Sequence, residues 1–114
     1  MDHRIEKILR KIENDISRKL VVRDLAAFVN LSVSRLQHLF KQETGISLVK
    51  HLNNLKLEKA CRLLETTDLH VKEIRLKVGI KNESHFQRNF KLKFGRTPNH
   101  YRNNFSRIAE SDSY

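Results

Sequence analysis

The sequence predicts an all-α protein of about seven helices. Apolar residues recur at spacings of three and four along most of the chain, which is the period of a helix with one buried face. No stretch keeps the apolar–polar alternation of a strand for long. The 114 residues include only three Gly and one Pro, which are too few turn residues for a β-sandwich or barrel.

The composition narrows the class of protein further. No apolar run approaches the roughly 20 residues of a membrane span, and the N-terminus lacks the apolar core of a signal peptide. The single cysteine, Cys61, cannot form an internal disulfide, which favours a reducing, cytoplasmic setting. Lys and Arg number 23 against 13 Asp and Glu, a net charge of +10. Such a field attracts polyanions, although charge without geometry is a weak signal.

The helices can be placed in order from the apolar periodicity and its breaks. A first helix is expected where one face carries Ile5, Ile8, Leu9, Ile12 and Ile16. Breaks follow at Asn30–Ser32, Gly45, Thr66–Asp68, Gly79–Asn82 and Gly95–Pro98. The predicted organisation is therefore a first subdomain at 1–48, a linker helix at 49–65, a second subdomain at 66–105 and a frayed tail at 106–114.

The chain repeats itself. LAAFVNLSVSRLQHLFKQETG, at 25–45, matches IRLKVGIKNESHFQRNFKLKFG, at 74–95, and the offset grows from 49 to 50 within the turn. Asn30 and Gly79 stand where a chain leaving a helix needs positive φ, and Ser32 and Asn82 are suitable N-caps for the next helix. Each copy therefore predicts a helix-turn-helix, and the second copy has one more turn residue.

The second helix of each copy has a polar face opposite its apolar one. In the first copy this face carries Ser34, His38 and Lys41, flanked by Gln37 and Gln42; in the second it carries Ser84, Arg88 and Lys91, flanked by Gln87. Arg pairs with guanine, Gln with adenine and Ser with either, and the two lysines suit phosphate. One such helix would indicate only solvent exposure, but two in a duplicated frame on a basic chain favour DNA recognition.

The linker helix then has a mechanical role. About 17 residues at ~1.5 Å each span about 25 Å. Successive major-groove faces on one side of B-DNA lie roughly 34 Å apart. A spacer of this length, with the width of each subdomain added, suits two recognition helices that enter adjacent grooves, with some bending of the DNA.

The stretch from Leu25 to Arg102 resembles the DNA-binding domain of the AraC/XylS family of bacterial transcription regulators. The resemblance is carried by LSVSRLQHLFKQETGISL, LKLEKACRLLETTDLHVKEI and VGIKNESHFQRNFKLKFGRTPNHYR, and most specifically by ESHFQRNFK followed by FGRTPNHYR. It implies two helix-turn-helix subdomains placed in adjacent major grooves of double-stranded DNA. By motif position, the base contacts would be Ser34, Gln37, His38, Ser84, His85 and Arg88. It also implies an activator that contacts RNA polymerase, and a sensory domain or a second protomer outside this chain is a further candidate partner.

Two departures from the family pattern lead to expectations about the fold. The family usually has a small residue at the position of Arg75, and the first copy keeps one, Ala26. A buried guanidinium without a partner is costly, so we expect Arg75 to turn outward, for instance to phosphate, or the second subdomain to pack differently. Val21 and His70 replace the family's Ser or Thr caps, so both short helices are expected to begin raggedly.

Other interpretations of the sequence, as a metal site, an enzyme or another kind of binding protein, have less support or remain open. The histidines lack paired metal-ligand spacing, and no nucleophile–base–orienter set is visible, so neither a metal, another cofactor nor an enzyme activity is expected. Arg96 and Arg102 fit either phosphate contacts or solvated surface positions. Two alternatives to specific DNA recognition stay open: nonspecific nucleic-acid binding, and a protein-interaction module whose first helix would carry exposed apolar residues.

Overall fold

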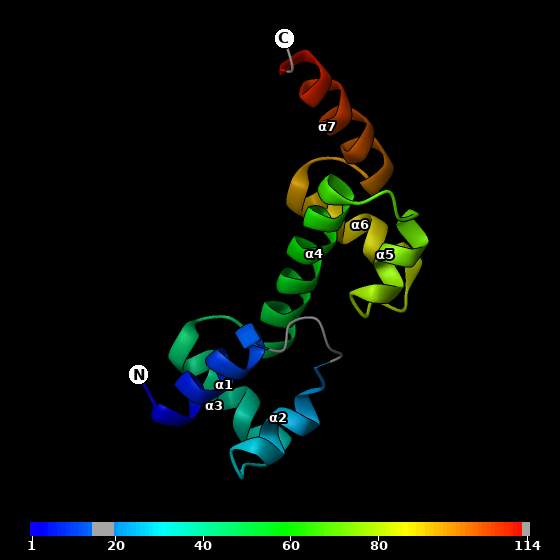
Figure 1. The fold of residues 1–114 in the computed structure, drawn as a ribbon. Helices are drawn as coiled ribbons and strands as arrows, with labels where there is room; N and C mark the ends of the chain where they lie inside the picture. The colour runs from blue at the N-terminus through cyan, green and yellow to red at the C-terminus, as the bar shows by residue number, and fades with distance from the viewer. Residues whose placement is uncertain (15–19, 113–114) are drawn as a thin grey trace. The chain divides into compact units, whose positions relative to one another are not determined.

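The computed structural model describes residues 1–14 and 20–112 and contains, within these ranges, seven α-helices and no strand (Figure 1). They are α1 (His3–Asn14), α2 (Val22–Phe28), α3 (Val33–Thr44), α4 (Leu48–Thr66), α5 (Val71–Lys77), α6 (Glu83–Phe94) and α7 (Pro98–Asp112). The all-α class is confirmed. The predicted core position Ile16 lies outside the described residues, and α7 continues to Asp112, into the segment expected to fray.

The chain forms two compact units, residues 1–55 and 56–114, and the boundary between them falls inside α4. Leu48 and Leu52, in the first part of α4, are buried in the core of the first unit. Leu57, Ala60 and Leu64, in its second part, are buried in the core of the second. The predicted linker is therefore also a structural element of each unit.

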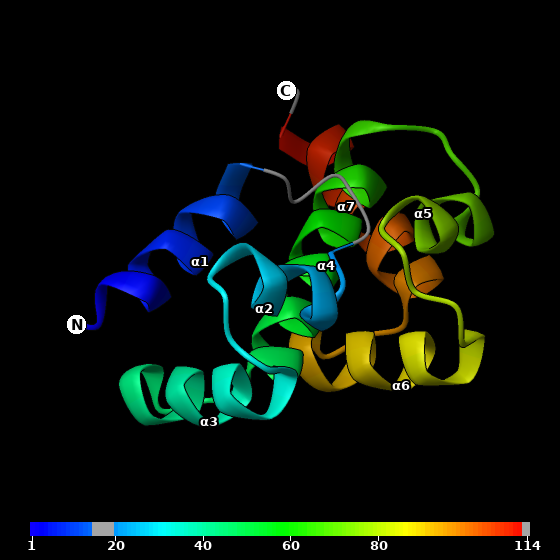
Figure 2. The same cartoon turned by 90° about the horizontal axis from the view of Figure 1, so that it is seen from below.

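In the first unit α1, α2 and α3 lie next to one another (Figure 2). Their apolar faces form the core of this unit. The side chains that are buried there from these three helices are Ile5, Ile8, Ile12, Leu25, Ala26, Leu36, Leu39 and Phe40. Burial of each large apolar side chain stabilises the folded state by about 1.5–3 kcal/mol. This offsets the entropy cost of ordering α2, a helix too short to be stable by itself.

The second unit is built around an aromatic cluster. Phe90 of α6 packs against Phe86, Phe94 and Tyr101, with ring centroids 5.9, 4.6 and 5.8 Å away. The hydroxyl of Tyr101 donates a hydrogen bond to Oε2 of Glu65 at 2.7 Å. A hydrogen bond with Cys61, burial and the bond to Glu65 all raise the pKa of the Tyr101 hydroxyl. These contacts fix α7 against α4 and α6.

Local capping fixes the start and end of both longer helices. The side chain of Ser32 accepts a hydrogen bond from the amide of Arg35 at 3.1 Å, and that of Asn82 accepts one from the amide of His85 at 2.9 Å. Asn30 and Gly79 adopt positive φ, 58° and 85°, in the two turns. These four expectations are confirmed.

The two shorter helices begin without a side-chain cap. The residues at their N-caps are Val21 and His70, and neither makes a capping hydrogen bond. The first helical backbone bonds are nevertheless formed, as in the capped helices: the amide of Leu25 donates to the carbonyl of Val21, and the amide of Ile74 to that of His70. Tertiary packing of Leu25 and Ile74, both fully buried, therefore stabilises these helices in place of a cap.

Arg75 is buried, and the expectation that it turns outward is wrong. Its side chain is 8% exposed, and Nη1 donates to the carbonyls of Ile80 and Lys81 at 2.9 and 2.6 Å. The desolvation cost that argued for exposure is offset because the guanidinium bonds the carbonyls of the following turn. The second subdomain can thus keep the same frame as the first.

Arg102 also has its partners within the fold. Its Nε donates to the carbonyl of Leu64 at 3.3 Å, Nη2 to that of Thr67 at 3.1 Å and Nη1 to that of Leu69 at 2.6 Å. These carbonyls belong to the end of α4 and the connection to α5, where helix hydrogen bonding stops. The guanidinium of Arg102 therefore has a structural role, because it links α7 to the end of α4 and the connection that follows.

Candidate nucleic-acid interface

The outer face of α3 is a row of polar side chains above a buried apolar face. Leu36 and Phe40 are fully buried, which fixes the rotation of α3 about its axis. This rotation leaves Ser34, Gln37, His38 and Lys41 exposed. Because Ser32 caps the helix, its first turn, which carries Ser34, is held in place. All four side chains predicted for this helix are thus accessible on one element.

The outer face of α6 carries the second polar set. Phe86 and Phe90 are buried, and Ser84, His85, Arg88 and Lys91 are exposed. An open depression on this side is lined by Glu83, Ser84, Gln87, Arg88, Lys91 and Thr97. The structure therefore brings Ser84, Arg88 and Lys91 together, whereas His85 does not line the depression.

Three residues join the α6 surface that the predicted set of base contacts did not include. Gln87 was identified only as a flanking residue, and Glu83 and Thr97 were not identified. Helical periodicity could have added Glu83, which lies one turn before Gln87. Thr97 belongs to the connection between α6 and α7, so its proximity depends on tertiary structure. The combined surface offers a guanidinium, an amide, a carboxylate and hydroxyls, which match the donor and acceptor patterns of base edges.

The cations near the end of α6 differ in their surroundings. Lys91 lines the depression, and Arg96 is exposed just after the helix ends at Gly95. Lys93, two residues from Lys91, instead pairs with Glu58 of α4, with Nζ 3.5 Å from Oε1. The two lysines differ because their side chains leave α6 on different faces.

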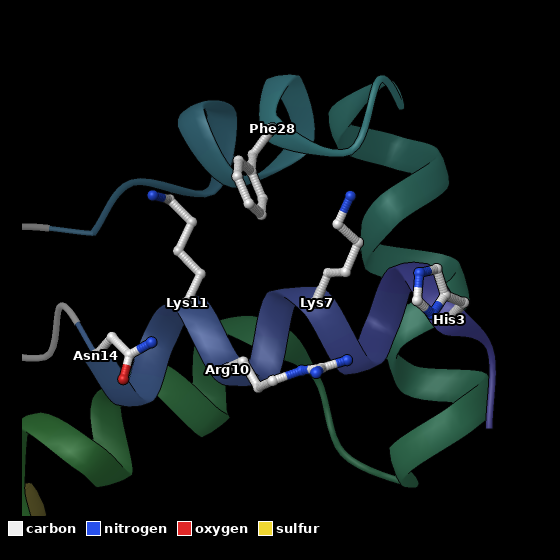
Figure 3. A pocket seen from close by; sticks show the side chains of 6 residues that line it. All are labelled: His3, Lys7, Arg10, Lys11, Asn14 and Phe28. Atoms are coloured by element: carbon white, nitrogen blue, oxygen red, sulfur yellow. The ribbon is translucent and has the colours of Figure 1, made fainter.

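The first unit has a second basic surface, between α1 and α2. It is a groove lined by His3, Lys7, Arg10, Lys11, Asn14 and Phe28, and we call it the α1–α2 groove (Figure 3). Phe28 is 44% exposed, and its ring points from α2 toward α1. The ammonium groups of Lys11 and Lys7 lie 4.6 and 5.7 Å from the ring centroid, which are cation–π distances.

The cysteine and the potential metal ligands do not form a further site in the described part of the chain. Cys61 is buried, and this burial raises the pKa of its thiol, so the reactive thiolate is disfavoured. Within the described residues, no group of three His, Cys, Asp or Glu side chains is arranged to hold a metal ion. None of the described helices is sufficiently long and apolar to span a membrane.

Comparisons with known proteins give a consistent match. A family model described as a helix-turn-helix domain matches residues 25–104. The chain is 31% identical over 102 residues to the HTH-type transcriptional regulator MtrA of Neisseria gonorrhoeae, covering 90% of this chain but 33% of that protein. It is 33% identical over 100 residues to the Transposon Tn10 TetD protein of Escherichia coli, covering 88% of this chain and 72% of that protein. The chain thus spans about a third of the length of the first relative and most of the second.

A solved structure shares the fold. The C-terminal domain of AraT, a response regulator from Geobacillus stearothermophilus, superposes with a TM-score of 0.79 at 33% sequence identity. The match covers 90% of this chain and 86% of that one. It therefore includes nearly all of the helices described above.

Proposed function

The chain belongs to the AraC/XylS family of helix-turn-helix, DNA-binding transcription regulators, and from this premise we propose that it recognises a specific double-stranded DNA site by inserting α3 and α6 into adjacent major grooves. The observation that carries the proposal is the pair of exposed polar faces, each held by a capped helix with a buried opposite face. Both faces come from a repeat, so the same geometry is offered twice.

Each recognition helix supplies base-edge contacts. We assign this role to Ser34, Gln37 and His38 in α3, and to Ser84, His85 and Arg88 in α6. Arg88 is the strongest candidate because a guanidinium can bond O6 and N7 of guanine together. Gln87 joins this set because it lines the same depression as Arg88.

We assign phosphate contacts to Lys41 and Lys91, on these faces, and to Arg96, which follows α6. Such contacts fix the position of a protein on the duplex without reading its sequence. The central helix α4 has 19 residues and is therefore about 28 Å long, and it contributes residues to the core of each unit.

The proposal extends to activation of transcription in the cytoplasm, with RNA polymerase as the protein partner. The resemblance to a family composed mostly of activators supports this part. Because the chain spans about a third of the first relative, an additional sensory domain or a second protomer remains part of the proposal.

Selection of bound sequences from random duplex DNA by the whole chain tests the proposal. We expect two conserved half-sites with centres about 10 base pairs apart, one for each recognition helix. Recovery of one half-site only would contradict the use of both helices. Recovery of no preferred sequence would favour nonspecific nucleic-acid binding instead.

The α1–α2 groove favours a second function, the binding of an acidic segment of a partner protein. Exposed apolar residues on α1 are not the basis, because Ile5, Ile8 and Ile12 are buried. The basis is charge: cationic side chains surround an exposed aromatic ring, which suits carboxylates next to an apolar side chain.

A double charge reversal, Lys7→Glu with Arg10→Glu, tests this function. We expect activation in a transcription assay to fall severalfold, while affinity for the selected DNA site stays within about twofold. Lys50→Glu, an exposed position on α4 of the same unit, is the control for a change of charge. An equal loss of DNA affinity and activation would instead place DNA in the groove.

A further inference from the structure

We infer that Arg75 is a positioning residue for DNA recognition: it fixes the longer turn of the second helix-turn-helix, and thereby sets the orientation of α6. The inference rests on the proposed function in one respect, that α6 reads bases. It is carried by a comparison between the two copies within this one chain.

The two turns share one backbone hydrogen bond and differ in length after it. The connection from α2 to α3 consists of residues 29–32, and that from α5 to α6 of residues 78–82. In the first, the amide of Leu31 donates to the carbonyl of Ala26 at 2.9 Å; in the second, the amide of Ile80 donates to that of Arg75 at 3.0 Å. The additional residue of the second turn, Lys81, follows this shared hydrogen bond.

Arg75 binds the backbone at the additional residue and at the residue just before it. Its Nη1 donates to the carbonyls of Ile80 and of Lys81 itself. Ala26, the equivalent residue of the first copy, has no side chain that could make such bonds, and its turn has no additional residue. The longer turn and the arginine that spans it therefore occur in the same copy.

These bonds determine where α6 begins. Asn82 follows Lys81 directly and caps α6 through the amide of His85. A carbonyl held at Lys81 therefore holds the cap, and with it the first turn that carries Ser84. If the turn moved, the buried guanidinium of Arg75 would lose both of its hydrogen-bond partners. An unpaired buried charge is costly, so the turn is held in place. Arg75 thus acts on DNA recognition without contacting DNA.

Amide hydrogen exchange of the free protein tests the positioning role directly. In Arg75→Ala we expect the amides of His85 and Phe86, which bond Asn82, to exchange about tenfold faster. The matching amides of Arg35 and Leu36 in the first unit should be unchanged. Equal acceleration in both units, or no acceleration at His85 and Phe86, would overturn the inference.

Binding to the selected DNA site tests the consequence for recognition. We expect Arg75→Ala to lose about tenfold in affinity, with relaxed base preference in the half-site read by α6 only. Deletion of Lys81 in the Arg75→Ala background restores a turn of the first copy's length. This double variant should recover both the affinity and the preference.

The double variant also decides the case in which Arg75→Ala alone does not fold. Recovery of a folded second unit on deletion of Lys81 supports the inference, and failure to recover overturns it. A wild-type chain without sequence preference would contradict the proposed function instead, and the exchange experiment would still test Arg75.

Discussion

Three arginines of the second unit show how environment separates the roles of one residue type. Arg88 is exposed among polar side chains that suit base edges. Arg75 and Arg102 use the same guanidinium to bond backbone carbonyls, in the turn before α6 and in the connection between α4 and α5 respectively. The guanidinium has five donors in a rigid fork, so it can hold several carbonyls at once. The residue type alone therefore does not predict whether an arginine has a structural role; its hydrogen-bond partners and its exposure do.

At this scale, Arg88→Ala tests base recognition. We expect binding to the preferred site to weaken by about 1–3 kcal/mol, with relaxed preference at one base pair, because a bidentate contact is lost. Competition binding with the selected site and its single-base variants measures both effects. Arg62→Ala, which removes an exposed guanidinium from α4, is the matched control.

Lys91→Ala gives the contrast for Arg88. Loss of a phosphate contact should weaken binding to all sequences alike and reduce the salt slope by about one. If Arg88→Ala behaved in the same way, and lost as much affinity on scrambled DNA as on the preferred site, Arg88 would be a phosphate contact and not a base contact.

At the scale of the element, different residues perform the same task in the two copies. Ser32 and Asn82 cap α3 and α6 with side-chain oxygens, and Asn30 and Gly79 both adopt the left-handed conformation in the turn. Both residue types in each pair satisfy the same physical requirement. The two copies therefore share the chemistry of their caps and turns more than they share residue types.

Substitution of each cap tests its contribution. Ser32→Ala and Asn82→Ala should each lower the free energy of unfolding of their own unit by about 0.5–2 kcal/mol, because an amide of the first turn loses its partner. Denaturant unfolding followed by a probe in each unit measures this. Ser32→Asn and Asn82→Ser are the controls and should change stability by far less. Exchanges as damaging as alanine would show that capping is not what these residues contribute.

At the scale of the whole molecule, the two units have separate cores that share one helix. Each core contains the residues of its own helix-turn-helix and one part of α4. An amphipathic helix that contributes Leu52 to one core and Leu57 to the other cannot be removed without exposing apolar surface in both. The net charge of +10 is a property of the whole molecule, and its electric field attracts a polyanion toward the protein.

Most of the architecture could be predicted from the sequence because its causes are local. Helical periodicity and residues tolerant of positive φ define helices over a few neighbouring residues. The exposed faces of α3 and α6 follow from the same periodicity, since Leu36 and Phe86 can be buried only if Ser34 and Ser84 face outward. The exposure of Ser34, His38, Ser84 and Arg88 was therefore predictable from the helical period alone.

The sequence by itself determined the helical class, the duplicated frame and the polar faces, because these depend on spacing along the chain. Only the tertiary structure decided which polar groups meet. Arg102 finds its carbonyls more than thirty positions earlier in the chain, at separations of 38, 35 and 33 residues. Thr97 joins the α6 surface across a turn, and Arg75 bonds a backbone that no periodicity locates. Such partnerships depend on distances between side chain and folded backbone, which exist only once the helices have packed.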